Sequence, residues 1–466
     1  MINPIEAYFL LNDRDQRVKI GSIGLVHNPP MEHNLRLRVT LAARACAMGC
    51  FALLILTSLS HAATVATIDV ADARTEAEVI RQLLDTRVGA PFEPGVWNDD
   101  LQRLLNTELF YDVRGAVRED GDARHLTVHA RNKFSLIPIF KYKQGGGTSL
   151  LTIGAYEVNL FDRLLEAGAQ YENMDGNPGG VIWFRHPYLL SPDNHFGAEL
   201  YVHTVGLPLL SLDGKEQAYF DNEERRFNMR LLHKWAPGVR FGIGFSLSTN
   251  DFLMDDSTVQ RMQRNAAFLA DHRLQSGRTV ALLPRAVFGR IDRSEFHVQG
   301  SEWTLQAELA HRILGSEFDF ARAEIRWLGA WLPARDWNLA AQAQLGTKTG
   351  HEAQHKFYLG GLDTLRGFLD GQFRGDHYWL VNAELRPTLW SAPHMVLQGN
   401  VFADLAKTWD EQRFSLNGFE RPFVSTGAGL RIILPRIYRA VLRLDVARTL
   451  TPVRQTGIAL GLQQFF

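Results

Sequence analysis

Cysteine is almost absent from this sequence. Only Cys46 and Cys50 occur among its 466 residues, and both lie in one apolar stretch near the N-terminus. Everything after that stretch lacks thiols, which excludes a disulfide framework and a thiolate metal site from the rest of the chain.

The sequence also lacks an excess of either charge. It carries 50 basic and 51 acidic residues, a formal net charge of -1. Because the overall charge attracts neither anionic nor cationic polymers, we expect no nucleic-acid partner.

Catalytic and metal-binding motifs are missing as well. The chain has no Gly-x-Ser-x-Gly, no phosphate-binding loop and no His-Glu-x-x-His pattern. The one histidine pair that we would inspect for a metal is His351 and His355, four residues apart, although loop histidines are more often solvated. We therefore predict no enzyme activity, no catalytic residues, no cofactor and no metal site.

One long hydrophobic run is present, from Ala45 to Leu59, and it falls short of the ~20 residues that cross a bilayer as a helix. It follows a basic segment and ends at Ser60-His61-Ala62. The small residues Ser60 and Ala62 predict a signal peptide cleaved after Ala62, with a membrane-spanning helix as the alternative. Since a signal peptide that starts at Met31 has ordinary proportions, we interpret residues 31–62 as the signal peptide and 1–30 as a non-native N-terminal extension.

Residues 63–133 mix strand and helix patterns in the order β-α-α-β-β. The predicted elements are a strand over 64–70, helices over 75–85 and 97–105, and strands over 109–117 and 125–131. This order predicts a small α+β domain in which two helices cover one face of a short sheet. Its exposed sheet edge could accept an extended peptide, although the domain could also be only a spacer or a plug.

After Lys133 the apolar residues alternate with polar ones, which is the pattern of strands. In 377–390, Val381, Ala383 and Leu385 share one face, whereas Asn382 and Glu384 share the other. The segments are long, several end in aromatic residues, and charges of both signs recur on the polar face, as in strands that separate lipid from water. A soluble sandwich is the alternative. The sixteen predicted strands lie near 135–143, 149–158, 163–172, 178–186, 195–204, 223–234, 238–248, 279–291, 294–311, 317–331, 334–346, 377–390, 395–407, 422–434, 438–449 and 454–466.

The connections between these strands differ in length at the two ends. Those after even-numbered strands are mostly short, whereas several after odd-numbered strands are long, including 205–222, 249–278 and 346–376. Such an even-stranded pattern predicts an all-β, 16-stranded transmembrane β-barrel over 134–466, with both termini on the periplasmic side. The final Phe466 on an amphipathic last strand resembles the sorting signal of outer-membrane barrels.

Two parts of the chain resemble a known family. The segments "VGAPF" and "LFYDV" in 63–133 resemble a POTRA domain. The stretch "LGGLDTLRGF" and the strand after it resemble the conserved loop and following strand of the bacterial surface antigen superfamily, the BamA/TamA/FhaC-like outer-membrane assembly and translocation barrels. The chain looks like a single-POTRA member of that superfamily.

The resemblance assigns roles to particular residues. It implies that the loop 347–376 folds into the barrel and that Arg366, within Leu365-Arg366-Gly367-Phe368, pairs with an acidic residue of the inner wall. The matching wall residue is Asp404, and Glu384 faces the lumen by the same alternation. An alternative is that Arg366 is a solvated loop charge.

The residues around this loop add to the prediction. Gly360 and Gly361 would let the loop turn sharply. The family's usual glycine two residues after the wall aspartate is Ala406 here. Gly457 and Gly461, in the last predicted strand, either weaken the seam with the first strand or are small residues facing the lumen.

The resemblance also implies a function and partners. It favours the insertion or translocation of polypeptides, with unfolded outer-membrane or secreted polypeptide clients, outer-membrane lipid, and periplasmic or lipoprotein partners. A channel gated or plugged by the loop is the alternative, because Arg366 and lumenal charges would serve it equally well. The expected location is the outer membrane of a Gram-negative bacterium, with the POTRA-like domain in the periplasm.

Overall fold

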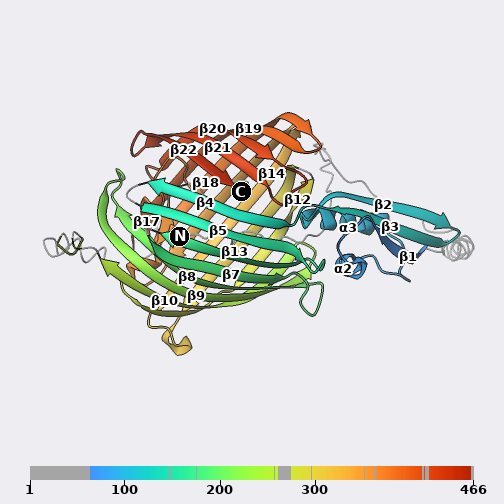
Figure 1. Cartoon of the computed structure of the whole chain (residues 1–466), viewed down its shortest axis with the longest axis horizontal. Helices are drawn as coiled ribbons and strands as arrows, with labels where there is room; N and C mark the ends of the chain where they lie inside the picture. Colours follow the sequence, from blue (N-terminus) through green and yellow to red (C-terminus); the bar gives the residue numbers. More distant parts are fainter. Residues whose placement is uncertain are drawn as a thin grey trace, which may run out of the picture.

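The structure of the chain, a computed structural model, describes residues 63–462 except 146–147, 175, 255, 257, 261–273, 295, 351, 362–363, 412–413 and 415–418. It comprises a small α+β domain and a large closed barrel (Figure 1). The predicted N-terminal extension, the predicted signal peptide and Phe466 lie outside the described residues.

The small domain has the predicted β-α-α-β-β order. Its sheet runs β1-β3-β2, with β1 parallel to β3 and β2 antiparallel to it. No helix among the described residues is long and apolar enough to cross a membrane. The elements are β1 (Thr64–Ala71), α2 (Ala77–Leu83), α3 (Pro94–Asn106), β2 (Phe110–Asp120) and β3 (Ala123–Asn132).

The helices cover one face of that sheet because each carries an apolar stripe. Ile80 from α2 and Trp97 and Leu104 from α3 are buried against strand residues such as Val128. Helix α3 begins at Pro94, whose fixed φ suits the first turn. At its end the Thr107 hydroxyl donates a hydrogen bond to the Leu104 carbonyl, at 2.7 Å.

The barrel is a closed ring of antiparallel strands, which confirms the predicted fold class. Seventeen strand segments form the ring among the described residues, but β11 and β12 both pair with β10 and β13, so they are two halves of one strand and the ring has sixteen. The segments are β4 (Leu136–Gly145), β5 (Thr148–Leu160), β6 (Leu165–Met174), β7 (Asn177–His186), β8 (Asn194–Leu210), β9 (Glu216–Ala236), β10 (Val239–Met254), β11 (Gly277–Leu282), β12 (Arg285–Ser294), β13 (His297–Ala310), β14 (Phe320–Ala334), β15 (Trp337–Lys348), β18 (His377–Ala392), β19 (Met395–Trp409), β20 (Phe423–Ile433), β21 (Val441–Thr451) and β22 (Thr456–Leu462).

Two details of the predicted strands differ from the structure. The predicted strand 279–291 is interrupted at Leu283-Pro284, because proline has no N–H to donate to a ladder. The predicted loop 205–222 is mostly strand, since β8 and β9 stay paired to Leu210 and Glu216. Alternation did not reveal this extension because its inner residues pack on other parts of the protein rather than on water, as Leu209 and Phe220 do with Leu274.

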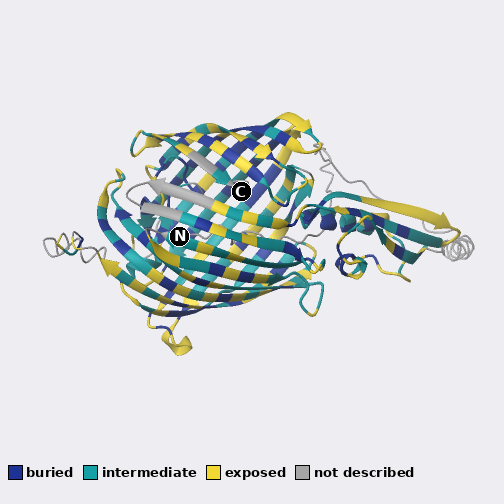
Figure 2. Ribbon diagram, viewed as in Figure 1, coloured by how far each residue is buried: buried dark blue, intermediate teal, exposed yellow. Residues whose placement is uncertain are grey.

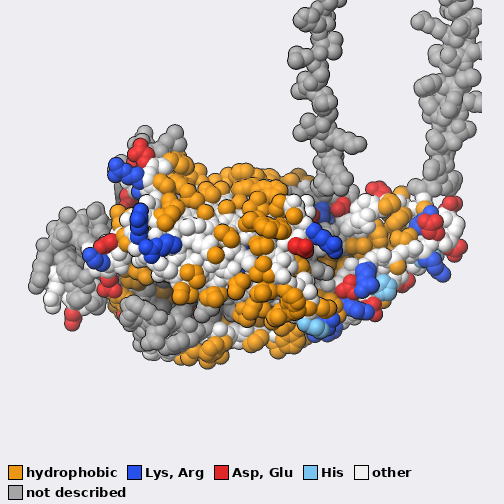
Figure 3. Space-filling view, turned by 90° about the horizontal axis from the view of Figure 1, so that it is seen from above, with side chains coloured by type: hydrophobic (Ala, Val, Ile, Leu, Met, Phe, Trp, Pro, Cys, Tyr) orange, Lys and Arg blue, Asp and Glu red, His pale blue; other side chains and the backbone are white. Residues whose placement is uncertain are grey.

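The two faces of the barrel wall have opposite chemistry. Along β18, Leu380, Asn382 and Glu384 are buried while Val381 between them is exposed, and the same alternation produces the chequered colouring of Figure 2. Exposed apolar side chains include Ile243, Trp303 and Val401. Figure 3 shows hydrophobic side chains over the middle of the barrel and charged ones towards its ends, as expected for a wall that faces lipid.

The small domain packs against the short-turn end of the barrel. Asn106 at the end of α3 donates to Asp292 on β12 at 2.9 Å. Glu108 lies 3.2 Å from the Arg293 guanidinium and 2.5 Å from Nε of Arg439 in the β20–β21 turn. The buried cluster of the domain also includes Tyr438 from that turn. Glu108 therefore ties the domain to β12 and to the β20–β21 turn, which lie far apart in the ring.

Neighbouring positive charges govern the protonation of Glu108. Burial alone would raise its pKa, but the guanidinium groups of Arg439 and Arg293 together with Lys133 outweigh burial and lower the pKa below the ordinary 4.5. A lowered folded-state pKa means that the ion pairs stabilise the docked domain above pH 4.5, and that this stabilisation is lost as the pH falls through the folded-state value.

We predict that Glu108→Gln weakens the docking of the small domain at neutral pH. The free energy of docking should fall by about 2 kcal/mol, which lies between the values for exposed and buried ion pairs. The measurement is hydrogen exchange of 99–109 and 288–294, corrected for intrinsic rates. Exchange in the unmodified protein should approach that of the variant as the pH drops below 4.5. The control is Glu119→Gln on the exposed β2–β3 hairpin. Equal protection in all three proteins at pH 7 would show that Glu108 does not hold the domain.

Candidate functional site

The candidate site is built on the connection between β15 and β18, which doubles back on itself. It contains the short helix η2 (Ala353–His355) and the two-stranded hairpin of β16 (Phe357–Leu359) and β17 (Phe373–Gly375). Between the hairpin strands the chain turns at Gly360-Gly361 and presents Leu365-Arg366-Gly367-Phe368 at its tip. We call residues 364–368 the loop tip.

Glycine is required at the turns of this connection. Gly360, Gly361 and Gly367 have φ of +127°, +79° and +90°, a region that residues with a Cβ rarely adopt. A Cβ at Gly360 would also lie 2.2 Å from the Leu369 carbonyl oxygen. The turn is closed by Thr364, whose hydroxyl accepts from the Gly360 amide at 2.7 Å.

An apolar cluster anchors the hairpin to the inner face of the barrel wall. Phe373 stacks on Phe423 of β20 with ring centroids 3.7 Å apart, and Phe368 meets Phe373 edge to face. Ala406 of β19, where the family usually has glycine, is fully buried in this cluster. The cluster consists of Phe357, Leu359, Leu365, Phe368, Phe373, Tyr378, Leu380, Ala406 and Phe423.

Arg366 reaches from the loop tip to carboxylates on the wall. Its Nε and one terminal nitrogen donate to the two oxygens of Asp404 at 2.8 and 2.7 Å, a bidentate pair, and its backbone N–H donates to Asp404 at 3.2 Å. Its other terminal nitrogen donates to Glu384 on β18 and lies 3.8 Å from Asp445 on β21. The whole side chain has 0% exposure.

These groups belong to a balanced network. Arg386 donates to Glu384 at 2.6 Å, and Arg431 on β20 donates to Asp445 at 2.6 Å. Three arginines thus face three carboxylates, all of them buried, and the plane of Arg366 lies 3.5 Å over the Phe402 ring. Neutral partners complete the pairing, as when Asn382 donates to both Asp404 and the Thr364 carbonyl.

Balance is what makes such burial tolerable. Taking an ion out of water costs several kcal/mol, and an opposite charge with good hydrogen-bond geometry offsets that cost. Removing one partner leaves the other buried and unpaired, which typically destabilises by about 3–5 kcal/mol. The arrangement can therefore hold the loop tip firmly.

The structure brings together the predicted loop motif, both loop glycines, Asp404 and Glu384. The sequence analysis missed Asp445, Arg431 and Arg386 as members of the network. A signal existed, because Asp445 falls on the polar face of its strand, and adjacent strands place it beside Arg431. Sequence alone could not show that the tip reaches as far as β21.

Only one histidine of the pair considered for a metal lies among the described residues. His355 is half-buried and stacks on Phe320 with centroids 4.0 Å apart, and His351 lies outside the described residues. Burial lowers the pKa of His355 to about 3, helped by the nearby Arg322. No group of three or more potential ligands occurs in the part of the chain that the structure describes.

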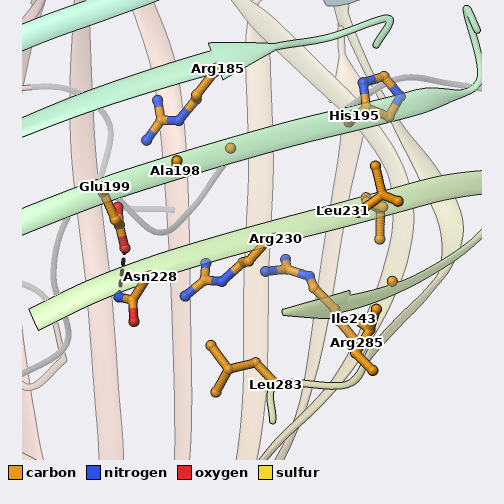
Figure 4. A pocket seen from close by; sticks show the side chains of 13 residues that line it. Arg185, His195, Ala198, Glu199, Asn228, Arg230, Leu231, Ile243, Leu283 and Arg285 are labelled. Atoms are coloured by element: carbon orange, nitrogen blue, oxygen red, sulfur yellow. Dashed lines mark hydrogen bonds between the residues drawn. The ribbon is translucent and has the colours of Figure 1, made fainter. Parts of the chain in front are cut away.

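A separate recess is lined by residues from β7 to β12, none of which belongs to the loop tip (Figure 4). Arg185, Arg230 and Arg285 line it, and Asn228 donates to Glu199 there at 2.9 Å. Gly197 and Gly242 also line it.

A closed sixteen-stranded ring with an apolar outer face and a charged inner face defines a transmembrane β-barrel protein. The chain belongs to the Omp85 superfamily, whose domain model matches residues 168–463. Barrels of this superfamily are outer-membrane proteins. No curated protein matches the sequence significantly.

Solved structures support the same fold. CdiB from Escherichia coli matches with a TM-score of 0.59 and 11% identity over 86% of this chain and 75% of that chain. CdiB from Acinetobacter baumannii matches with a TM-score of 0.54 and 14% identity over 86% of this chain and 74% of that chain. BamA from Haemophilus ducreyi lacking POTRA domains 1-3 matches with a TM-score of 0.51 and 12% identity over 85% of this chain and 83% of that chain. At these identities the likeness extends to the fold.

We predict that Arg366→Ala still yields an outer-membrane barrel, because the strand ladders do not depend on it, but that the barrel unfolds at a lower temperature. The measurement is the temperature at which the compact form disappears on a semi-native gel. Arg448→Ala, which removes an exposed arginine of β21, is the matched control and should leave that temperature unchanged. Identical temperatures for Arg366→Ala and the unmodified protein would show that the network does not hold the barrel.

Proposed function

We propose that this protein inserts or translocates polypeptides at the outer membrane, with the loop 347–376 folded into the lumen and the small domain capturing clients in the periplasm. The observation that carries the proposal is the burial of Arg366 among Asp404, Glu384 and Asp445. A plain pore needs charges along its wall, but it has no need of a loop tip fixed by a balanced network.

The side of the membrane follows from the barrel architecture. Bacterial outer-membrane barrels keep short turns in the periplasm and long loops outside. The small domain packs on turns such as β12–β13 and β20–β21, which are short. Its proposed place is therefore the periplasm, where an unfolded client would first arrive.

The small domain offers one open sheet edge. In the order β1-β3-β2, strand β1 is partly covered, because Val65 exchanges hydrogen bonds with Gly89 and Ala90. Strand β2 has no further partner among the described residues, and its second half is exposed from Arg114 onwards. An extended client segment can add to such an edge through main-chain hydrogen bonds, which tolerate many sequences.

We predict that Val117→Lys on β2 weakens client capture, since a lysine on an edge strand disfavours pairing with another strand. The side chain of Val117 is exposed, so folding should be unaffected. The measurement is cross-linking of the purified protein to an unfolded outer-membrane barrel. Val88→Lys, at an even more exposed valine of the same domain outside β2, is the control. Equal cross-linking of both variants would exclude β2 as the capture edge.

The main test is the folding rate of an unrelated outer-membrane barrel into liposomes that contain this protein. We expect acceleration by the unmodified protein and by Arg448→Ala, and its loss with Arg366→Ala. Absence of acceleration by the unmodified protein would contradict a general assembly role. A steady conductance in planar bilayers, in that case, would favour the alternative of a channel plugged by the loop.

A further inference from the structure

The loop tip also touches the last strand of the barrel. The Gln455 side chain, in the turn just before β22, donates from Nε2 to the Gly367 carbonyl at 2.9 Å. Gln455 is itself fixed to β21, because its amide donates to the Thr449 hydroxyl at 2.8 Å and its carbonyl accepts from the Thr449 amide at 2.9 Å. The loop tip therefore binds a rigid turn.

A close backbone approach reinforces this contact. A Cβ at Gly457 would lie 2.9 Å from the Cα of Gly367, so only glycine at 457 lets the loop tip lie this close to β22. Gly367 is equally confined, since a Cβ there would lie 3.0 Å from the side chains of Ala447 and Thr449. The sequence analysis left open whether Gly457 weakens the seam with the first strand or is a small residue facing the lumen. The contact between Gly457 and the loop tip explains this glycine as a packing requirement.

The strand that the tip contacts has a special place in the ring. β22 pairs with β21 on one side, and on the other it neighbours β4, the first strand, so it closes the barrel. The tip is bonded at the same time to Asp404 on β19 and Glu384 on β18 through Arg366. It thus links the closing strand directly to β19 and β18, which lie three and four strands away in the ring.

We propose that the loop tip regulates the closing strand, with Gln455 and Gly457 as the positioning residues that clamp β22 to it. This inference rests on the proposed function for its biological meaning, because a seam that must open for a client needs a device that holds it shut at rest. Release of Arg366 from its carboxylates withdraws Gly367 from Gln455 and Gly457, so the state of the loop determines how firmly β22 is held. The coupling is reciprocal: loosening β22 weakens the hold on the loop.

The test is hydrogen exchange of residues 456–462 in the full-length protein in liposomes. Gln455→Ala removes one hydrogen bond without adding bulk and should speed exchange in β22 roughly fivefold, as the loss of a single neutral hydrogen bond allows. Gly457→Ala should speed it more, because its methyl collides with backbone. Gly399→Ala on β19 is the matched control, since a Cβ there finds only ordinary contacts of 3.4 Å and longer.

The outcomes separate this inference from the proposed function. Faster exchange in β22 for Gln455→Ala and Gly457→Ala, but not Gly399→Ala, supports the clamp even if the unmodified protein fails to accelerate barrel folding. Unchanged exchange in both clamp variants overturns the clamp, even if folding is accelerated. Should Gly457→Ala fail to fold, Gln455→Ala decides alone.

Discussion

The burial of one guanidinium group organises this protein. Arg366 lies in the connection between β15 and β18. A buried guanidinium charge persists only with carboxylates in hydrogen-bond contact. Asp404 supplies both of its oxygens and Glu384 and Asp445 surround the remaining nitrogen. Because those carboxylates come from β19, β18 and β21, the loop has one docking position on the wall.

Several other features are consequences of that docking position. The glycines of the connection permit the reversal that delivers the arginine, and the aromatic cluster around Phe373 and Phe423 fills the space between hairpin and wall. Arg386 and Arg431 then neutralise the carboxylate charge that Arg366 alone would leave. Polar contacts fix the register of the tip, and apolar contacts supply the area that keeps the hairpin in place.

Sequence reasoning reached the fold because strands that separate lipid from water must alternate, and residues 381–386 alternate without a break. It also reached Arg366, Asp404 and Glu384, through a motif and the parity of two strands. It did not reach Asp445, Arg431 or Gln455, because their contacts depend on how far the tip travels across the wall, which no local pattern encodes. The extension of β8 and β9 was missed for a similar reason. Its apolar inner face packs on Leu274 rather than facing water, so its inner residues are not polar and the alternation is lost.

The shared cluster at the short-turn end has a consequence for how the chain acquires its structure. Val158, Leu164 and Tyr438, all from the barrel, belong to the same buried cluster as Ile80 and Leu104 of the small domain. The domain can therefore complete its core only after β5, the β5–β6 turn and the β20–β21 turn have formed beside it. The folding of the two parts is consequently coupled, because residues late in the sequence contribute to the core of the domain that is made first.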